Sequence, residues 1–261
     1  TFLCLNVMGK KGGVILPSLT WISDVVAVIK NDFRPDFTDI DFKTLSMNEA
    51  EILNKIEKKN NKILFITHAQ GFNGLTQKIL NKIKQKKIIL VEDVCESHGV
   101  QGPTGKKRGS DSIASSFSFY FGHHMTTIEG GMVCTNNTEL YELMRLKRSH
   151  GMAREASPEL FKKYSEENPQ CDPAFLFMTE GYNLRNHELC AVLGLSQMKR
   201  LDKNIRIRKN NYKYWWDRAQ KASNKYHLPE YQKGNSSFSF PLIPKGIALT
   251  QTLKSACKTN G

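Results

Sequence analysis

The chain has 261 residues, of which 39% are hydrophobic, so it is long enough to bury a substantial core. Its six cysteines lie far apart, without the paired spacing of a zinc site or a disulfide framework, and no apolar stretch approaches the roughly 18 residues of a membrane span. These features argue against disulfide-stapled and membrane-spanning classes, and they predict a globular protein of the reducing cytoplasm.

The net charge of +13 could indicate nucleic-acid binding, because lysine and arginine gain affinity by releasing phosphate counterions. The lysines, however, fall mostly on predicted helix faces between apolar positions, as Lys78, Lys82 and Lys86 do. That distribution is typical of solvated helix surfaces. We therefore expect no nucleic-acid partner, although a modest positive field would attract anionic substrates such as nucleotide diphosphates.

Short β-branched runs alternate with segments of helical period along the first half of the chain. This alternation predicts a mostly parallel sheet with helices on its faces, the α/β class. Ligands of open α/β sheets bind at the carboxyl ends of the strands, so the acidic pair Glu92 and Asp93 marks a candidate site. The expected strands are 14–16, 34–40, 62–67 and 88–92, and the expected helices are 24–31, 48–59 and 75–86.

The second half is less regular. Residues 152–180 contain three prolines and no clean period, so we expect a functional excursion outside the sheet. A long helix is expected from about Asn186 to Ala222 with a break near Leu201, and residues 238–242 are expected to begin another unit as a strand. Before these segments we expect strands at 115–121 and 132–135 and a helix at 139–148.

Asp93 follows a buried strand, where a carboxylate can hold a proton on a heterocyclic nitrogen, as pyridoxal enzymes require. A strand-end aspartate is also often a turn former or a helix cap, so this residue alone leaves both interpretations open. Glu96 and His98 lie just beyond it and are ambiguous in the same way.

Residues 118–131 read SFYFGHHMTTIEGG, in which His123 and His124 precede small polar residues and paired glycines. An imidazole titrates near pH 6.5, so it can accept and return a proton at neutral pH. Two other interpretations compete. The histidines could bind a metal together with Glu129, although they lack the i, i+4 spacing of a helical ligand pair, or they could be ordinary loop residues.

Several motifs follow the order and approximate spacing of the DegT-type sugar aminotransferase family, which is fold-type I and pyridoxal phosphate dependent. They are LPSLTW at 16–21, VEDVCESHG at 91–99, the segment at 118–131, RSHG at 148–151, GYNLR at 181–185 and GLSQM at 194–198. The chain resembles this family from about residue 13 to 210. The resemblance implies a mostly parallel, seven-stranded-type sheet with flanking helices.

The same resemblance implies a domain division. Residues 1–222 would form the large cofactor-binding domain, without its N-terminal part, and residues 223–261 would begin a small C-terminal domain. Family members have more chain on both sides of the matching landmarks, including a phosphate-cradling loop at a helix N-terminus. The sequence therefore resembles an internal fragment that could lack activity by itself.

One position departs from the aminotransferase pattern. Where an aminotransferase carries the lysine that binds the cofactor covalently, five residues beyond the phosphate-binding serine, this chain has His123. Because imidazole cannot form that bond, the cofactor would be held noncovalently. A related branch with an iron–sulfur cluster is disfavoured, since only Cys171 lies in the relevant excursion.

The histidine resembles the 3-dehydratase branch of the family. That branch implies removal of the C3 hydroxyl from a 4-keto-6-deoxy sugar nucleotide, of the GDP-linked type, with pyridoxamine phosphate as cofactor. L-glutamate would regenerate this amino form from pyridoxal phosphate. Two alternatives stay open: a sugar-nucleotide aminotransferase, which leaves the amino group on its product, and a non-catalytic sugar-nucleotide binding protein of the same fold.

The resemblance also implies roles for matching residues. His123 would be the catalytic acid–base, and Asp93 would hold the proton on the ring nitrogen. Trp21 would stack on the ring, Glu96 would lie near the ring hydroxyl and Ser118 would bind the phosphate. Structural alternatives are core filling for Trp21, a strand hydroxyl for Ser118 and a helix-face acid for Glu96.

The resemblance assigns three further residues to the dimer interface or to the substrate. Asn183 resembles the residue that the family supplies across a dimer interface to the neighbouring subunit's cofactor phosphate, which implies a homodimer with shared sites. His150 and Arg154 resemble residues near the substrate of the 3-dehydratases.

Overall fold

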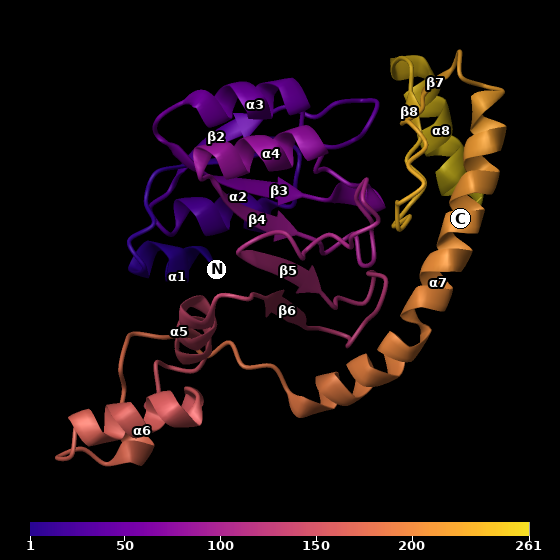
Figure 1. Ribbon diagram of the computed structural model, residues 1–261. Coiled ribbons are helices and arrows are strands. Elements are labelled where there is room, and N and C mark those ends of the chain that lie inside the picture. The colour runs from indigo at the N-terminus through magenta and orange to yellow at the C-terminus, as the bar shows by residue number, and fades with distance from the viewer. Residues whose placement is uncertain (261) are drawn as a thin grey trace.

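The computed structural model describes residues 1–260 and contains a six-stranded sheet with helices on both faces (Figure 1). Neighbouring strands are parallel except for the pair β5 and β6, which is antiparallel. The α/β class with a mostly parallel sheet is therefore confirmed, although the sheet of the described residues has six strands where the resemblance implies seven. In spatial order the strands are β2 (Arg34–Thr38), β1 (Gly13–Pro17), β3 (Asn61–Thr67), β4 (Ile89–Asp93), β5 (Ala114–Ser118) and β6 (Gly131–Cys134).

Helices follow most strands, as the sequence periodicity predicts. The first four cover the two faces of the sheet, and α7 lies beyond its carboxyl edge (Figure 1). The helices are α1 (Phe2–Val7), α2 (Ile22–Ile29), α3 (Glu49–Glu57), α4 (Gln77–Lys86), α5 (Thr138–Arg148), α6 (Pro158–Glu167), α7 (Glu188–Gln220) and α8 (Ile247–Asn260).

Alternating side chains of the central strands build two separate cores, because successive strand residues point to opposite faces. Leu64 of β3 packs in a cluster with Ile52 of α3 and Ile79 of α4 on one face. Its neighbour Phe65 packs in a second cluster with Leu5 of α1 on the other face. Both layers hold the carboxyl ends of β3 and β4 in fixed positions.

In the second half of the chain, three predicted segments can be compared with the structure. The excursion at 152–180 lies outside the sheet, as predicted, and contains α6. The break near Leu201 was wrong, since α7 is continuous over 33 residues with no proline to interrupt its hydrogen bonds. The strand at 238–242 was also wrong, because the preceding backbone bonds to loops rather than to a ladder, and only Ile243–Pro244 (β8) pairs with Tyr226–His227 (β7).

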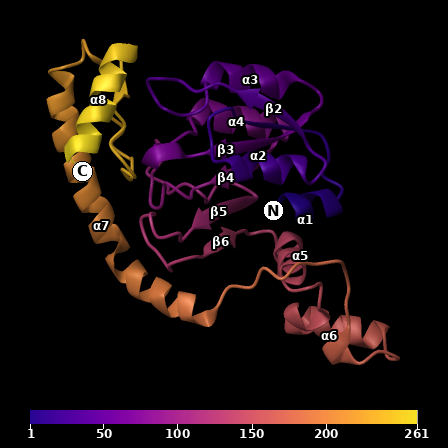
Figure 2. The ribbon, with the colours of Figure 1, turned by 180° about the vertical axis from the view of Figure 1, so that it is seen from behind.

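Figure 2 shows the same arrangement from behind, with α7 leading to α8 on the side of the sheet opposite α6. The division at residue 222 stays a prediction, although α7 ends close to it, at Gln220. Despite the length of α7, no helix within residues 1–260 is both long and apolar enough to cross a membrane.

Candidate functional site

Asp93 closes β4 in the middle of the carboxyl edge of the sheet, in register with Thr67 of β3 and Ser116 of β5. Its side chain is only 6% exposed, and its Oδ1 accepts a hydrogen bond from the backbone N–H of Cys95 at 2.9 Å. Within residues 1–260 it forms no ion pair. A carboxylate can accept several hydrogen bonds, so Asp93 retains capacity for a protonated ring nitrogen.

The neighbouring acid Glu92 has a structural role on the opposite face of β4. Its Oε2 accepts hydrogen bonds from His68 Nε2 at 2.9 Å and from the Gly109 N–H at 3.0 Å. His68 Nδ1 accepts from the Gly74 N–H, so the hydrogen that Glu92 accepts lies on Nε2. Burial acts to raise the pKa of Glu92, but the bonds from His68 and Gly109 lower it to about 2. Of the two acids, only Asp93 is available to a ligand.

His123 lies in the loop between β5 and β6, within electrostatic range of Glu96 and Asp93. Burial lowers its pKa, and the negative charges of Glu96 and Asp93 partly oppose that shift. Its Nδ1 is buried and has no hydrogen-bond partner among the described residues, while the Phe238 ring lies 5.5 Å from the imidazole. His123 is therefore a base whose Nδ1 has no partner in the described part of the chain, and its lowered pKa leaves it largely neutral at pH 7.

The next residue, His124, anchors the loop instead. It is buried, and its Nε2 lies 2.9 Å from the carbonyl oxygen of Ser236. Burial lowers the pKa of His124 to about 4, and burial also lowers the pKa of the nearby His98 to about 3. The metal alternative gains no support, since no group of three or more His, Cys, Asp or Glu side chains in the described part of the chain could hold an ion.

Glu96 and Ser118 flank this pair on the same edge. Glu96 is half-buried and accepts hydrogen bonds from the backbone and side-chain amides of Gln70 at 2.7 and 3.2 Å. Ser118 ends β5, and its Oγ accepts from the Tyr120 N–H at 3.3 Å. Glu96 thus lies in a turn held by a loop contact and is not on a helix face, whereas the Ser118 hydroxyl binds backbone as its structural alternative predicts.

Trp21 stands just before α2, where β1 has ended. Its indole is 76% exposed, which excludes core filling within a single chain. The preceding Thr20 places it beside the site, because the Thr20 hydroxyl lies 3.0 Å from that of Thr67, the neighbour of Asp93 in the sheet. An exposed aromatic face at this edge suits stacking on a planar ring.

The C-terminal strap, residues 232–238, closes the site and was not expected from the sequence. The Ser236 N–H donates to the Gly71 carbonyl at 2.9 Å, and the Gln101 N–H donates to the Gly234 carbonyl at 2.8 Å. Gly71 has φ +87°, and a Cβ there would lie 2.6 Å from the Ser237 nitrogen, so the close approach requires glycine. The strap thereby brings Phe238 onto the His123 ring.

Asp24, in the first turn of α2, is a second site residue that the sequence analysis missed. It is 7% exposed and accepts a hydrogen bond from the Thr67 hydroxyl at 3.1 Å. An acid in the first turn of a helix is ordinarily explained by the helix dipole, so only the motif position just after Trp21 could have suggested a site role.

The remaining predicted residues lie elsewhere in the chain. Asn183 pairs with Ser149 after α5, and the His150 N–H donates to the Tyr182 carbonyl at 2.8 Å. Arg154 is exposed nearby, 3.4 Å from the Ala174 carbonyl oxygen. Because β6 runs antiparallel to β5, α5 lies at the other end of these strands from the His123 loop (Figures 1 and 2). One chain therefore does not bring these three residues to Asp93.

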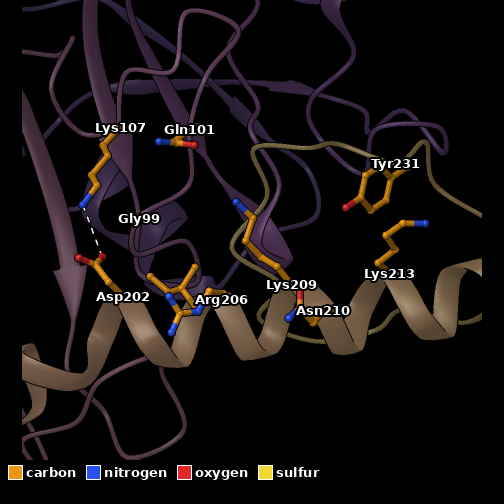
Figure 3. Close-up of a pocket in the computed structure, with 10 residues that line it drawn as sticks. Gly99, Gln101, Lys107, Asp202, Arg206, Lys209, Asn210, Lys213 and Tyr231 are labelled. Atoms are coloured by element: carbon orange, nitrogen blue, oxygen red, sulfur yellow. Dashed lines mark ion pairs between the residues drawn. The ribbon is translucent and has the colours of Figure 1, made fainter.

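A pocket of about 360 Å³ lies between α7 and the loop after β4 (Figure 3). Lys107 and Arg206 give its wall a basic character, but Lys107 already pairs with Asp202 at 3.7 Å, and Lys213 pairs with Asp217 at 2.7 Å. None of the predicted site residues lines it. We therefore place the candidate site at the Asp93–His123 edge.

The residues at that edge fit pyridoxal phosphate or its amino form. Asp93 offers a buried acceptor for the ring nitrogen, Trp21 an open aromatic face, and His123 a nitrogen without a partner. Ser118 offers a hydroxyl at the end of β5. Each of these groups keeps capacity for a ligand beside its contacts within the chain, which is the arrangement expected of a cofactor cradle.

The comparisons with known proteins agree with this fit. The model of the DegT/DnrJ/EryC1/StrS aminotransferase family matches residues 2–259. The chain is 32% identical to GDP-4-keto-6-deoxy-D-mannose 3-dehydratase of Yersinia pseudotuberculosis, over 90% of this chain and 60% of that protein. It is 31% identical to GDP-perosamine synthase of Escherichia coli O157:H7, over 77% of this chain and 50% of that protein.

A solved structure is also similar. The E. coli GDP-4-keto-6-deoxy-D-mannose-3-dehydratase with bound hydrated pyridoxal phosphate superimposes with a TM-score of 0.86 at 28% identity, covering 98% of this chain and 68% of that one. The chain thus spans about 60% of the length of its curated dehydratase relative.

Proposed function

The chain belongs to the DegT/DnrJ/EryC1/StrS aminotransferase family, and from this membership we propose that it is the central part of a nucleotide-sugar 3-dehydratase. The cofactor is pyridoxal 5′-phosphate or its amino form, as the family and the solved relative with bound pyridoxal phosphate indicate. The proposed substrate is a GDP-linked 4-keto-6-deoxy sugar, by likeness to the named relatives. L-glutamate is the proposed amine donor that regenerates the cofactor.

His123 carries the proposal. The position that would bind the cofactor covalently is occupied by an imidazole, and no lysine within residues 1–260 is hydrogen-bonded or ion-paired to Asp93, Glu96 or His123. A transaminase needs an amine there to pass the cofactor between covalent partners, whereas a dehydratase needs a base that also serves as an acid. A largely neutral imidazole whose Nδ1 has no hydrogen-bond partner among residues 1–260 meets the second requirement.

Each side chain then has a task. When bound, pyridoxamine phosphate supplies an amine for the sugar's keto group and a ring that accepts electrons. Asp93 keeps the ring nitrogen protonated, Trp21 stacks on the ring and Ser118 donates its hydroxyl to the phosphate. His123 would accept the proton that the amino form of the cofactor releases at its C4′ carbon, and would return it to the C3 hydroxyl, which would leave as water. Glu96, held by Gln70, lies on the side of the ring hydroxyl.

We further propose that two copies assemble and exchange residues. Exposed apolar side chains gather on β6, on the His123 loop and at the start of α7, which is the kind of patch that marks an interface. A second copy on this face would bring its Asn183 to the cofactor phosphate, together with His150, which is bonded to the adjacent Tyr182, and with Arg154 nearby. The exposed residues are Tyr120, Phe121, Ile128, Met132, Val133, Leu184, Leu189, Val192, Leu193, Leu195 and Met198.

The covalent state of the cofactor tests the proposal. The full-length protein is mixed with pyridoxal phosphate, its absorbance is followed before and after L-glutamate, and the mixture is reduced with borohydride for peptide mass analysis. We expect conversion to the amino form and no lysine adduct. His123→Lys is the matched control, which should form the adduct. A lysine adduct in the native protein would overturn the proposal.

A sugar-nucleotide aminotransferase is the second candidate, favoured by the 31% identity to a GDP-perosamine synthase. The two candidate functions differ in where the amino nitrogen ends up: an aminotransferase leaves it on the sugar, whereas the dehydratase releases it as ammonia. Product mass therefore separates the two functions. His123 in place of an amine favours the dehydratase.

A further inference from the structure

Two buried carboxyl groups meet beneath the carboxyl edge of the sheet. Asp24 and Asp93 are 7% and 6% exposed, and they come from different elements, α2 and β4. The Thr67 hydroxyl donates to Asp24 Oδ2 at 3.1 Å, and Thr67 is the partner of Asp93 in the sheet. The Thr20 hydroxyl also donates to Asp24 Oδ2, so both threonines bind the same oxygen.

No ion-paired cation compensates these carboxyls, and burial lowers the pKa of the one imidazole within electrostatic range of Asp93 in the described chain, that of His123. Neither forms an ion pair within residues 1–260. The third titratable group in contact is the Cys95 thiol, whose pKa is raised by burial and by the charges of Asp93 and Asp24, so it stays neutral. Two adjacent carboxylates in a buried site cannot both ionise at low cost, and such a pair retains one proton.

The two aspartates are not equivalent. The backbone N–H of Cys95 donates to Asp93 Oδ1, so this oxygen acts as an acceptor. Both hydroxyl bonds of Asp24 go to Oδ2, which leaves Oδ1 to carry a proton toward Asp93. Burial and the charge of Asp93 raise the pKa of Asp24 to about 7, against the opposing effect of the Thr20 and Thr67 hydrogen bonds.

We propose that Asp24 is a positioning residue: it holds the single proton of the Asp24–Asp93 pair and donates it as a hydrogen bond to Asp93. Asp93 is then oriented from two sides, by Asp24 and by the Cys95 N–H, and it presents one negative charge to the ligand. The ligand is the cofactor ring nitrogen, which rests on the proposed function. The carboxyl pair itself is a property of the chain without cofactor.

The test begins with the cofactor-free full-length protein labelled at the aspartate carboxyl carbon. NMR titration should show one aspartate that protonates well above the ordinary pKa of about 3.9. Asp24→Asn, which is isosteric and neutral, should remove this titration. Asp93→Asn should move it to lower pH, because the neighbouring charge is gone. A native protein in which every aspartate titrates below about pH 5, or an unchanged titration in Asp24→Asn, would overturn the inference.

Cofactor affinity gives the second readout, measured at pH 6, where Asp24 carries its proton. Asp24→Asn can still donate to Asp93, so we expect its pyridoxal phosphate affinity to stay within about threefold of native. Asp24→Leu has similar volume but no donor, and should bind about tenfold more weakly, as the loss of a hydrogen bond to a charged group predicts. Equal affinity of the two variants would overturn the positioning role. If neither the native protein nor the variants bind pyridoxal phosphate, but the native protein still has an aspartate with a raised pKa, the proposed function is refuted and the inference about the carboxyl pair is kept.

Discussion

Replacing Glu92 by glutamine should destabilise the fold in a pH-dependent way. Glu92 is fully buried, and hydrogen bonds from His68 and Gly109 lower its pKa from 4.5 to about 2. Each pKa unit is worth about 1.4 kcal/mol, so the ionised form adds about 3 kcal/mol to the free energy of unfolding at pH 7. Because the folded pKa is the lower one, this contribution is complete above pH 4.5 and is lost as the pH falls toward 2, to about 1 kcal/mol at pH 3.

Urea unfolding of native protein and Glu92→Gln at pH 7, 4 and 3, followed by circular dichroism, measures that difference. The matched control is Glu166→Gln on the exposed face of α6, where a surface pair with Lys162 at 3.8 Å predicts a change within about 0.5 kcal/mol. A Glu92→Gln protein as stable as native at pH 7 would refute the reasoning. So would a stability difference that does not shrink toward pH 3.

Three further predictions concern the site. His123→Asn should lower dehydration about 10²- to 10⁴-fold in steady-state assays while pyridoxal phosphate still binds, since only acid–base capacity is removed; loss of binding would contradict this. Asn183→Ala should be inactive alone but should regain activity when mixed with His123→Asn, because mixed dimers contain one intact shared site; no recovery after subunit exchange would argue against sharing. In pH–rate profiles, the acid limb of kcat/KM should lie below the ordinary histidine value of about 6.5, because burial lowers the pKa of His123. Phe238→Ala should move this limb to higher pH, because it exposes the His123 ring. An acid limb that Phe238→Ala leaves in place would contradict that cause.

The sheet could be predicted from the sequence because its strands are short, β-branched and separated by amphipathic helices. β3 was expected at 62–67 and is Asn61–Thr67, and α4 was expected at 75–86 and is Gln77–Lys86. The segment 238–242 was predicted as a strand and is not one. Its aromatic alternation resembles a strand, but its backbone bonds to the turn at Gly71, a tertiary contact that periodicity does not encode.

Site residues that belong to a sequence motif could be predicted, whereas those that only the packing of distant segments brings together could not. Asp93 and His123 stood out at a strand end and in an unusual loop, and the structure brings them together. Asp24 was missed because its partner Thr67 lies 43 residues away, and only the parallel pairing of β1, β3 and β4 brings them side by side. The roles of Asn183, His150 and Arg154 stay predictions, since they depend on a second copy of the chain.

Mass analysis of the sugar product tests the central claim most directly. The full-length protein is incubated with GDP-4-keto-6-deoxymannose, pyridoxal phosphate and ¹⁵N-labelled L-glutamate. The account predicts a sugar nucleotide that has lost the C3 oxygen, carries no label, and is accompanied by labelled ammonia. A product that retains the C3 hydroxyl and carries the labelled nitrogen would contradict it and establish an aminotransferase instead.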